Sequence, residues 1–270
     1  MTVEAPPVAA LGRDQTSGTS WWKVVLPPLA ALVVVLAIWY PLTIPLKGFL
    51  PTPVDVLGAF IDAWTSSGFY GHLIQTFRRV VIGVVASYLT GTAVGMAMGR
   101  SRSIEAFALP WVMVALAIPG PVVILFSVLL IGLSESALLI ALWIVVTPFV
   151  VNIVYDGVKA FDPGLDDMAR VYRLSAREQF RQVLLPQLAP SLFSAAKVGF
   201  ALSWKIVVII EALSLPNGIG GQLELFFRLL QPGRVVAWTL SFTVVMILVE
   251  VLVFRTAERR VFSWRKEARL

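Results

Sequence analysis

The sequence predicts an all-α membrane protein with six transmembrane helices and a charged helical hairpin on the cytoplasmic side. Three observations support this prediction. Hydrophobic residues make up 58% of the 270 residues and charged residues only 14%, which lies well outside the usual composition of soluble domains. Six apolar runs approach the roughly 20 residues that a helix needs to cross a bilayer. Basic residues gather on one side of these runs.

The six expected spans are joined by short connections. The first 22 residues lack an apolar core flanked by basic residues, so we expect a disordered cytoplasmic tail and not a cleaved signal peptide. The third run contains the break Pro119–Pro121, which makes it one discontinuous span. The spans are expected over Val24–Tyr40, Val80–Met98, Ala106–Ile131, Ala137–Tyr155, Leu192–Ile210 and Val235–Phe254. They form one membrane domain over residues 23–258, and a basic cytoplasmic tail follows over 259–270.

The basic residues determine the predicted orientation. With six spans, 15 of the 22 Lys and Arg residues fall on one side together with both termini, and the positive-inside rule assigns that side to the cytoplasm. The net charge of +6 therefore reflects membrane topology, and we do not expect nucleic acid as a partner. The chain is therefore expected to pass through a membrane several times, with both termini in the cytoplasm.

Small residues recur at every fourth position of the second span. Because a spacing of four places them on one helix face, another helix can approach closely there. This face either packs within the bundle, forms a homodimer contact or lines a pore. The residues are Gly83, Ser87, Gly91, Gly95 and Gly99 in the second span, with Ala195, Gly199 and Ser203 repeating the pattern in the fifth.

Two outer segments are expected to form short helices. After the first span and a proline-rich stretch, apolar residues follow a helical spacing that fits a surface helix; these are Val54, Leu57, Phe60, Ile61 and Trp64. In residues 215–233 a turn precedes a short amphipathic helix. Neither segment is long enough to form a domain.

A charged hairpin is predicted over residues 162–186. Asp162 followed by Pro163 is typical of a helix start. Ser175 with Glu178 forms a capping box that begins a second helix, and Pro186 is expected to stop that helix. The few apolar residues of the hairpin cannot form a core, so it either lies on lipid headgroups or docks in a groove of a partner.

The hairpin resembles the cytoplasmic loop of binding-protein-dependent permeases of ATP-binding cassette (ABC) importers. That loop reads E-A-A, three residues, G, nine residues, then I-x-L-P. Here the pattern falls on Asp167-Met168-Ala169, Arg173 and Val183-Leu184-Leu185-Pro186 with the spacing kept. The resemblance covers nearly the whole chain and indicates the nitrate, sulfonate and taurine branch, through "LPTPVDVL", "AIPGPVVILFSVLLIGLSESA", "NIVYDGV" and "GFALSWKIVVIIEAL" followed by "GIGG".

The resemblance implies a type I ABC importer permease fold whose hairpin docks into an ATPase subunit. It also implies a location in the bacterial cytoplasmic (inner) membrane. It implies as partners a second copy of the chain, two nucleotide-binding ATPase subunits and an extracytoplasmic solute-binding protein. ATP and Mg would be bound by the ATPase subunits, since the chain has no G-x-x-x-x-G-K-[ST] loop. The residues carried over as the ATPase-coupling set are Asp167, Met168, Ala169, Arg170, Tyr172, Arg173, Leu174, Ser175, Ala176 and Pro186.

Arg173 stands where the family pattern has glycine. A glycine adopts the left-handed conformation without strain, whereas an arginine there costs about 1 kcal/mol. Either the turn differs, or Arg173 is a solvated surface residue, or an acidic patch on the ATPase binds it, because arginine pairs well with carboxylates.

Lys205 lies inside the fifth span, where a charge is costly and where the family usually has an apolar residue. It either faces the translocation pathway and attracts an anion, or pairs with a carboxylate or reaches an interface. Glu211, on a different face of the same helix, is expected to cap or brace the outer loop. Asn152 either bonds between helices or acts in a gate. The pathway candidates are Ser203, Trp204, Lys205, Glu211, Asn152 and Tyr155.

His72, Arg78 and Arg79 are expected at the outer mouth of the second span, in a structural or headgroup role or in docking of the solute-binding protein. The chain has no cysteine and one histidine, so neither a metal site nor a bound cofactor is expected. We find no set of groups for hydrolysis, so the expected role is a non-catalytic permease subunit that imports a small organic or inorganic anion. Alternatives are an aromatic carboxylate, a thiamine-precursor pyrimidine, or a gated channel.

Overall fold

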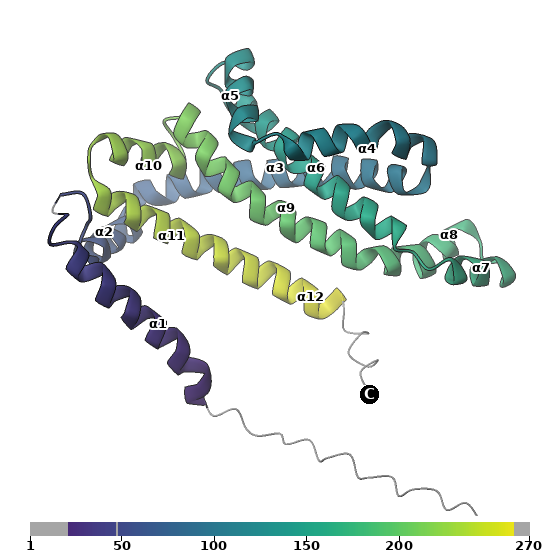
Figure 1. Ribbon diagram of the computed structural model, residues 1–270, viewed down its shortest axis with the longest axis horizontal. Coiled ribbons are helices and arrows are strands. Elements are labelled where there is room, and N and C mark those ends of the chain that lie inside the picture. The colour runs from purple at the N-terminus through teal and green to yellow at the C-terminus, as the bar shows by residue number, and fades with distance from the viewer. Residues whose placement is uncertain (1–20, 47, 262–270) are drawn as a thin grey trace, which may run out of the picture. The chain divides into compact units, whose positions relative to one another are not determined.

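The computed structural model describes residues 21–46 and 48–261 of the chain. Within these ranges the regular structure is entirely helical, as predicted (Figure 1). The chain divides into two compact units after Pro53. The elements are α1 (Trp21–Leu42), α2 (Pro53–Thr65), α3 (Ser67–Arg100), α4 (Arg102–Ala117), α5 (Gly120–Ile131), α6 (Glu135–Lys159), α7 (Pro163–Val171), α8 (Ala176–Glu178), the π-helical η1 (Gln179–Leu184), α9 (Leu185–Ser214), α10 (Ile219–Arg228), α11 (Pro232–Glu250), the π-helical η2 (Val251–Arg255) and α12 (Thr256–Val261).

The first unit contains α1 and the turns that follow it. Its described apolar part runs over residues 26–42. The hydroxyl of Thr43 donates to the carbonyl oxygen of Tyr40 at 2.7 Å, and the indole N–H of Trp39 donates to the carbonyl oxygen of Pro51 at 3.1 Å. These bonds fold the connecting segment back against the end of α1.

Four continuous helical stretches of the second unit are long and apolar enough to cross a bilayer. They are Ser67–Arg100, Glu135–Lys159, Gln179–Ser214 and Pro232–Glu258. A fifth stretch is formed by α4 and α5 together, which bend by 96° between Ala117 and Gly120. The bend confirms the predicted interruption, because the prolines there supply no amide hydrogen. The described residues thus contain four or five of the six predicted spans.

The second span is longer than the sequence indicated. We expected it over Val80–Met98, but α3 begins at Ser67 and continues to Arg100 as one helix of 34 residues. Its first turns contain polar side chains, including Thr76 and Arg79, that are nevertheless buried. The apolar pattern did not extend to these turns because Thr76 and Arg79 are polar. They can be buried because partners distant in sequence satisfy their polar groups.

The small-residue face of α3 packs against α6, which confirms close packing within the bundle. A Cβ atom placed on Gly95 would lie 2.7 Å from the carbonyl oxygen of Val151 and 2.9 Å from Cβ of Val154. A Cβ atom on Gly91 would lie 2.7 Å from Cβ of Val150. Only glycine therefore allows α3 and α6 to approach this closely.

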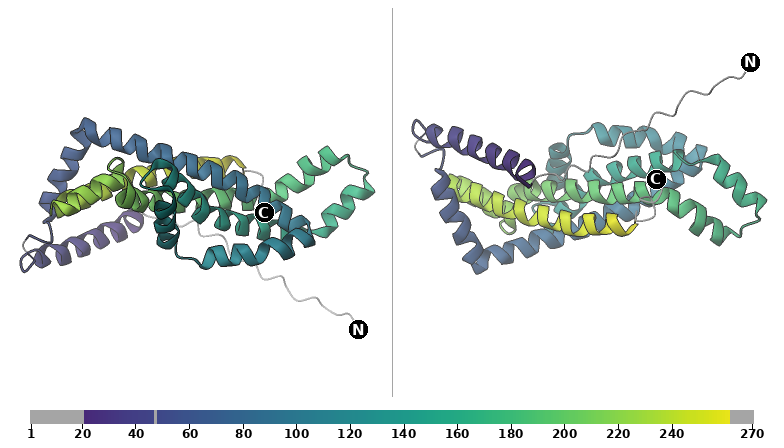
Figure 2. Two further views of the ribbon diagram at one scale, coloured as in Figure 1. Left: turned by 90° about the horizontal axis from the view of Figure 1, so that it is seen from above. Right: turned by 90° about the horizontal axis from the view of Figure 1, so that it is seen from below.

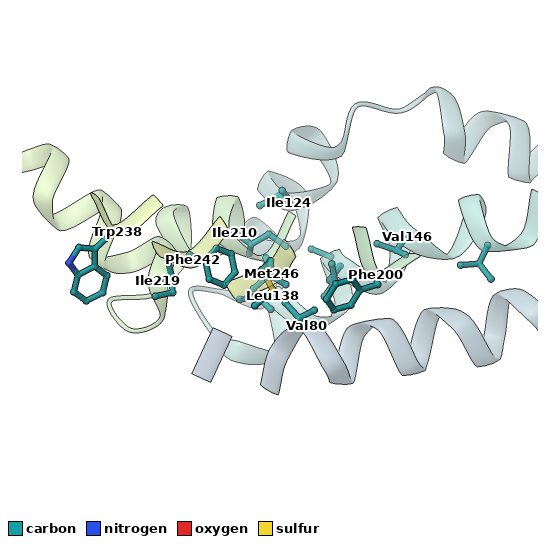
Figure 3. Close-up of a cluster of buried hydrophobic side chains, with 14 of the residues drawn as sticks. Val80, Ile124, Leu138, Val146, Phe200, Ile210, Ile219, Trp238, Phe242 and Met246 are labelled. Atoms are coloured by element: carbon teal, nitrogen blue, oxygen red, sulfur yellow. The ribbon is translucent and has the colours of Figure 1, made fainter. Parts of the chain in front are cut away.

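The core lies where α3, α6, α9 and α11 meet. Val80, Leu138, Ile210 and Met246 are buried there, each from a different one of these helices, and Figure 3 shows their side chains gathered together. Phe200 of α9 extends the same cluster toward the cytoplasmic half predicted from the sequence. This interior fixes the helices that carry the candidate functional residues.

The second unit places its two short helical features at opposite ends. The hairpin formed by α7 and α8 projects from one end of the bundle, while α10 lies at the other end beside α9 and α11 (Figure 1 and Figure 2). The chain runs directly from η1 into α9. The hairpin is thereby joined to the helix that carries Lys205.

Candidate functional site

The first helix of the hairpin begins as the sequence predicted. The side chain of Asp162 accepts a hydrogen bond from the backbone N–H of Gly164 at 2.8 Å, which satisfies one of the free donors at the start of α7. The backbone N–H of Asp162 donates to the side-chain oxygen of Gln187 at 3.1 Å. This second bond ties the start of α7 to the start of α9.

The predicted capping box is also present. The backbone N–H of Ser175 donates to Oε2 of Glu178 at 2.9 Å, and the Ser175 hydroxyl donates to the same oxygen at 2.6 Å. In return the backbone N–H of Glu178 donates to Oγ of Ser175 at 3.4 Å. The hydrogen bonds from the Ser175 side chain and backbone hold the pKa of Glu178 below its ordinary value.

Pro186 does not end the second helix of the hairpin, so this prediction is wrong. Helical structure continues from α8 through η1 into α9, with Pro186 in the first turn of α9. In η1 the hydrogen-bond pattern widens by one residue, and the backbone N–H of Leu185 donates to the carbonyl oxygen of Phe180. This local π-helical turn lets the helix pass a residue that has no amide hydrogen.

Arg173 adopts the left-handed conformation, with φ of 51°. The backbone N–H of Leu174 donates to the carbonyl oxygen of Ala169, and that of Arg173 to the carbonyl oxygen of Arg170, both at 3.0 Å. These two bonds define a Schellman motif that closes α7. The turn is therefore the one that glycine would form, and Arg173 occupies it at a cost of about 1 kcal/mol.

One face of α7 exposes apolar side chains to the surroundings. Leu165, Met168, Val171 and Tyr172 follow helical spacing, and we call them the coupling face. Val171 is 79% exposed and Tyr172 74% exposed. Sequence reasoning missed Val171 because the family pattern does not mark it, although its place beside Tyr172 could have indicated it.

Other residues of the coupling set have different surroundings. Ala169 is 2% exposed and faces the interior of the hairpin, where α7 packs against η1. Leu174 is half-buried, while Asp167, Arg173 and Ser175 are exposed. Arg170 is exposed and interacts with other groups of the chain. The structure describes the backbone of Ala176 at the start of α8.

At the opposite end of the second unit, Glu211 lies in a buried polar cluster. Nη1 of Arg79 lies 2.6 Å from Oε1 of Glu211, and the two side chains are 2% and 0% exposed. The hydroxyl of Thr76 lies 2.8 Å from Oε2 of Glu211, and the backbone N–H of Gly220 donates to the same oxygen at 3.0 Å. Both carboxylate oxygens are therefore engaged within the protein.

The same cluster fixes the loop before α10. Nη2 of Arg79 donates to Oδ1 of Asn217 at 2.7 Å. The backbone N–H of Gly218 donates to Nδ1 of His72 at 3.1 Å, at a position whose φ of 95° suits glycine. Glu211 thus braces the loop before α10, the loop that the sequence predicted it would cap or brace, while Arg79 and His72 have structural contacts. Arg78 pairs with Glu135 across to α6.

Lys205 lies on an exposed face of α9 in the single chain. Its Nζ atom is 5.5 Å from the centroid of the neighbouring Trp204 ring, a cation–π distance. No carboxylate lies within ion-pair distance of Lys205 in the part of the chain that the structure describes. Ser203, by contrast, is fully buried.

A cavity of 250 Å³ lies beside this part of α9. It is lined by Ile118 and Gly120 at the break between α4 and α5, by residues of α6, and by Leu202 and Ile206 of α9. Since Lys205 is next to Ile206 and three residues after Leu202, it borders the helix face that lines this cavity.

Tyr155 and Asn152 have partners near the hairpin end of α6. The hydroxyl of Tyr155 donates to Oε1 of Glu105 at 2.6 Å, and Nζ of Lys159 lies 2.6 Å from Oε2 of the same residue. The side-chain amide of Asn152 donates to Asp156 at 3.2 Å on the same helix. Sequence reasoning missed Glu105, whose partners are at least 50 residues away.

Comparisons with known proteins agree with this architecture. Residues 83–261 match the family described as "Binding-protein-dependent transport system inner membrane component". The chain is 27% identical over 250 residues to a putative aliphatic sulfonates transport permease protein, SsuC, of Bacillus subtilis strain 168, covering 91% of this chain and 88% of the relative.

Two further relatives have comparable coverage. The nitrate import permease protein NrtB of Synechococcus elongatus is 25% identical, with 82% of this chain and 83% of the relative covered. The taurine transport system permease protein TauC of Escherichia coli K12 is 24% identical, with 88% and 90% covered.

The fold is similar to that of a solved transporter. A crystal structure of an amino acid ABC transporter with histidines matches with a TM-score of 0.57 at 23% identity, over 77% of this chain and 96% of that chain. The extent of the family match, together with this fold, shows that the chain belongs to the binding-protein-dependent inner membrane components, the non-catalytic membrane subunits of ABC importers whose ATP is bound by partner subunits.

Proposed function

We propose that this permease works as a homodimer and imports a small organic or inorganic anion of the sulfonate, taurine or nitrate class. The observation that carries the substrate class is Lys205, a cation inside a membrane span without an ion pair among the described residues. Three relatives of the chain are described as permeases for aliphatic sulfonates, nitrate and taurine, which supports the same class.

The energetic cost of placing a charge at bilayer depth argues that Lys205 faces the pathway and not lipid. A lysine at the centre of a lipid-exposed helix costs about 2.5–3.5 kcal/mol. Lys205 is nine residues before the end of α9, about 14 Å along the helix, so reaching the outer interface is difficult. A water-filled pathway between two copies removes that cost, and the cavity at the α4–α5 break lies on the adjoining face. Broken helices commonly line transport pathways.

The other pathway candidates are assigned different roles. Trp204 holds the Lys205 ammonium by its cation–π contact. Ser203 and Glu211 are buried inside the bundle, so we assign Ser203 to packing and Glu211 to the outer brace. Tyr155 joins α6 to α4 through Glu105. We assign Asn152, which bonds to the next turn of its own helix, to the same end of the pathway.

The proposed topology has six spans with both termini in the cytoplasm. The span that completes the six is α1, the first helix of the chain. If it is counted from residue 23, the permease domain has the limits 23–258. The tails 1–22 and 259–270 would then lie on the cytoplasmic side, where their basic residues agree with the positive-inside rule. The predicted tails lie outside the described residues, apart from residues 21, 22 and 259–261.

The hairpin 162–186 is proposed as the contact with the ATPase. The coupling face presents four apolar side chains on a short helix, and hydrogen bonds cap this helix at both ends. A short amphipathic helix of this kind fits a groove on a partner protein. Since two ATPase subunits each need one such helix and the chain supplies one, the proposal requires two copies.

Transport by the complete complex tests the substrate class. Reconstituted vesicles would contain the permease, its ATPase subunits and the solute-binding protein, and uptake of labelled taurine and nitrate would be measured. Lys205→Met should reduce uptake of the transported anion by at least about tenfold, because about 1.4 kcal/mol of lost attraction corresponds to that factor. Lys197→Met, an exposed lysine of the same helix, is the matched control and should leave uptake unchanged.

A neutral pyrimidine or an aromatic carboxylate as the transported solute would contradict the proposed class. Equal uptake by the Lys205→Met and Lys197→Met variants would remove the argument from charge, even if an anion were transported.

A further inference from the structure

A second cationic site lies at the hairpin end of the second unit, and its residues are distant in sequence from Lys205. A cavity of 590 Å³ opens between the end of α3, the start of α4 and the end of α6. Arg100, Arg102 and Lys159 line it together with Glu105, Ala106 and Leu109. Three cations therefore surround a single carboxylate.

The carboxylate in this cavity is already neutralised. Oε2 of Glu105 lies 2.6 Å from Nζ of Lys159, and Oε1 accepts the hydroxyl hydrogen of Tyr155 at 2.6 Å. Arg100 and Arg102 are both exposed and form no salt bridge of 4.0 Å or less within residues 21–46 and 48–261. The cavity thus carries about two uncompensated positive charges.

The apolar surroundings of the cavity match an amphiphilic ligand. Ala106 and Leu109 supply apolar lining. One turn after Leu109, on the same face of α4, Met113 is 53% exposed, whereas Phe107 and Trp111 lie on the opposite face of the helix. Arginine side chains donate paired hydrogen bonds to phosphate oxygens, and basic pockets between transmembrane helices are typical sites for anionic lipid headgroups.

We propose that this cavity binds a phosphate-type oxyanion through Arg100 and Arg102. The ligand is either the headgroup phosphate of an anionic phospholipid, with its acyl chains along the exposed face of α4, or free phosphate from solution. The site is distinct from Lys205, although Glu105 in its lining bonds to the pathway candidate Tyr155. Its placement at the cytoplasmic leaflet rests on the proposed orientation, whereas binding itself does not.

Binding to the purified full-length chain in detergent tests the site, with two probes that separate the sources. Native mass spectrometry would count bound phosphatidylglycerol, with phosphatidylcholine of the same acyl chains as the uncharged reference. Calorimetry with inorganic phosphate would measure binding of the free ion. Binding of either probe by the unaltered chain, and not of phosphatidylcholine, is the expected result.

Substitutions then locate the binding. Arg100→Gln with Arg102→Gln should weaken binding roughly tenfold to thirtyfold, because each basic residue contributes about 1 kcal/mol of attraction to an anionic lipid. The control, Arg228→Gln with Arg234→Gln, removes the same charge at α10 and α11 and should leave binding unchanged. Arg100→Lys with Arg102→Lys keeps the charge and should retain most of the affinity, which separates loss of charge from a folding defect.

The proposal is overturned if neither probe binds, or if binding survives in the Arg100→Gln, Arg102→Gln variant. If that variant binds both probes normally and also no longer assembles with the ATPase subunits, the arginines belong to a protein interface and not to an anion site. Loss of anion binding with normal substrate uptake leaves the proposed function standing, so the two failures are distinguishable.

Discussion

Glu211 and Arg79 are the most informative pair of single residues. They are 132 positions apart, fully buried and 2.6 Å from each other. Such a pair is costly to desolvate, and removing one partner leaves the other as an uncompensated buried charge. The pair therefore fixes where α9 and the loop before α10 lie relative to α3.

Glu211→Gln is expected to destabilise the purified chain by about 3–5 kcal/mol, because Arg79 keeps its charge but loses its counter-ion. Arg79→Met should have an effect of similar size. The double variant Arg79→Met with Glu211→Met should be less destabilised than the sum of the two, because neither charge is then left alone. Thermal unfolding in detergent would measure all three, and additive losses would contradict the role of the pair.

Arg173 allows a test of backbone strain. Arg173→Gly should stabilise the hairpin by about 1 kcal/mol, because glycine accepts a φ of 51° without the steric cost of a side chain. Hydrogen exchange of the backbone amides in α7 and α8 would show this as stronger protection.

The control is Tyr172→Gly, since Tyr172 has a right-handed helical conformation. A glycine there should weaken protection, because a right-handed conformation does not need the positive φ that glycine allows, and glycine costs about 1 kcal/mol in a helix. If Arg173→Gly also weakened protection, the strain assignment would be wrong.

At the scale of elements, local signals predicted the hairpin well and distant contacts poorly. The caps of α7 and α8 were predictable because Asp162, Ser175 and Glu178 act on backbone groups within three residues. The glycine face of α3 was predictable because its spacing matches the helix repeat. The continuation through Pro186 was not, because a π-helical turn replaces the lost hydrogen bond without a local signal. The buried pairing of Arg79 was equally hidden, since its partners lie in another helix.

The coupling face gives a test at the level of one element. Met168→Asp with Tyr172→Asp should abolish binding to the ATPase subunits and substrate-stimulated ATP hydrolysis, because two charges would replace the apolar side chains that we propose contact the ATPase. The side chains are 44% and 74% exposed, so the permease itself should remain folded. Met168→Leu with Tyr172→Phe keeps the apolar surface and is expected to retain coupling. Normal assembly of the aspartate variant would refute the assignment of this face.

At the scale of the whole molecule, the sequence predicted the protein family, the all-α membrane fold class and the helix break at Pro119–Pro121. It did not predict how the chain assembles with partners. The composition indicated a membrane protein, and the spacing of Asp167, Arg173 and Pro186 indicated the importer family to which the chain belongs. Whether a second copy faces the exposed side of α9 around Lys205 has no signal in the sequence of one chain. Contacts between copies depend on surfaces that apolar membrane helices also present to lipid.

The mass of the purified complex tests the homodimer. Two permease copies with two ATPase subunits are expected, because each ATPase requires one coupling face. Native mass spectrometry of the detergent-solubilised complex would give the stoichiometry directly. A single permease copy beside two ATPase subunits would contradict the proposal.

The passage of the helix through Pro186 has a mechanical consequence. From Gln179 to Ser214 the chain is one stretch of 36 helical residues, about 54 Å long. It starts beside the proposed ATPase contact, passes Lys205, and ends next to the Arg79–Glu211 brace. A tilt of about 5° around its midpoint would displace each end by about 2 Å in opposite directions. A push at the hairpin would thus travel along one continuous helix to the loop before α10, and the π-helical turn of η1 and Pro190 are the points at which this helix could bend and absorb part of the motion.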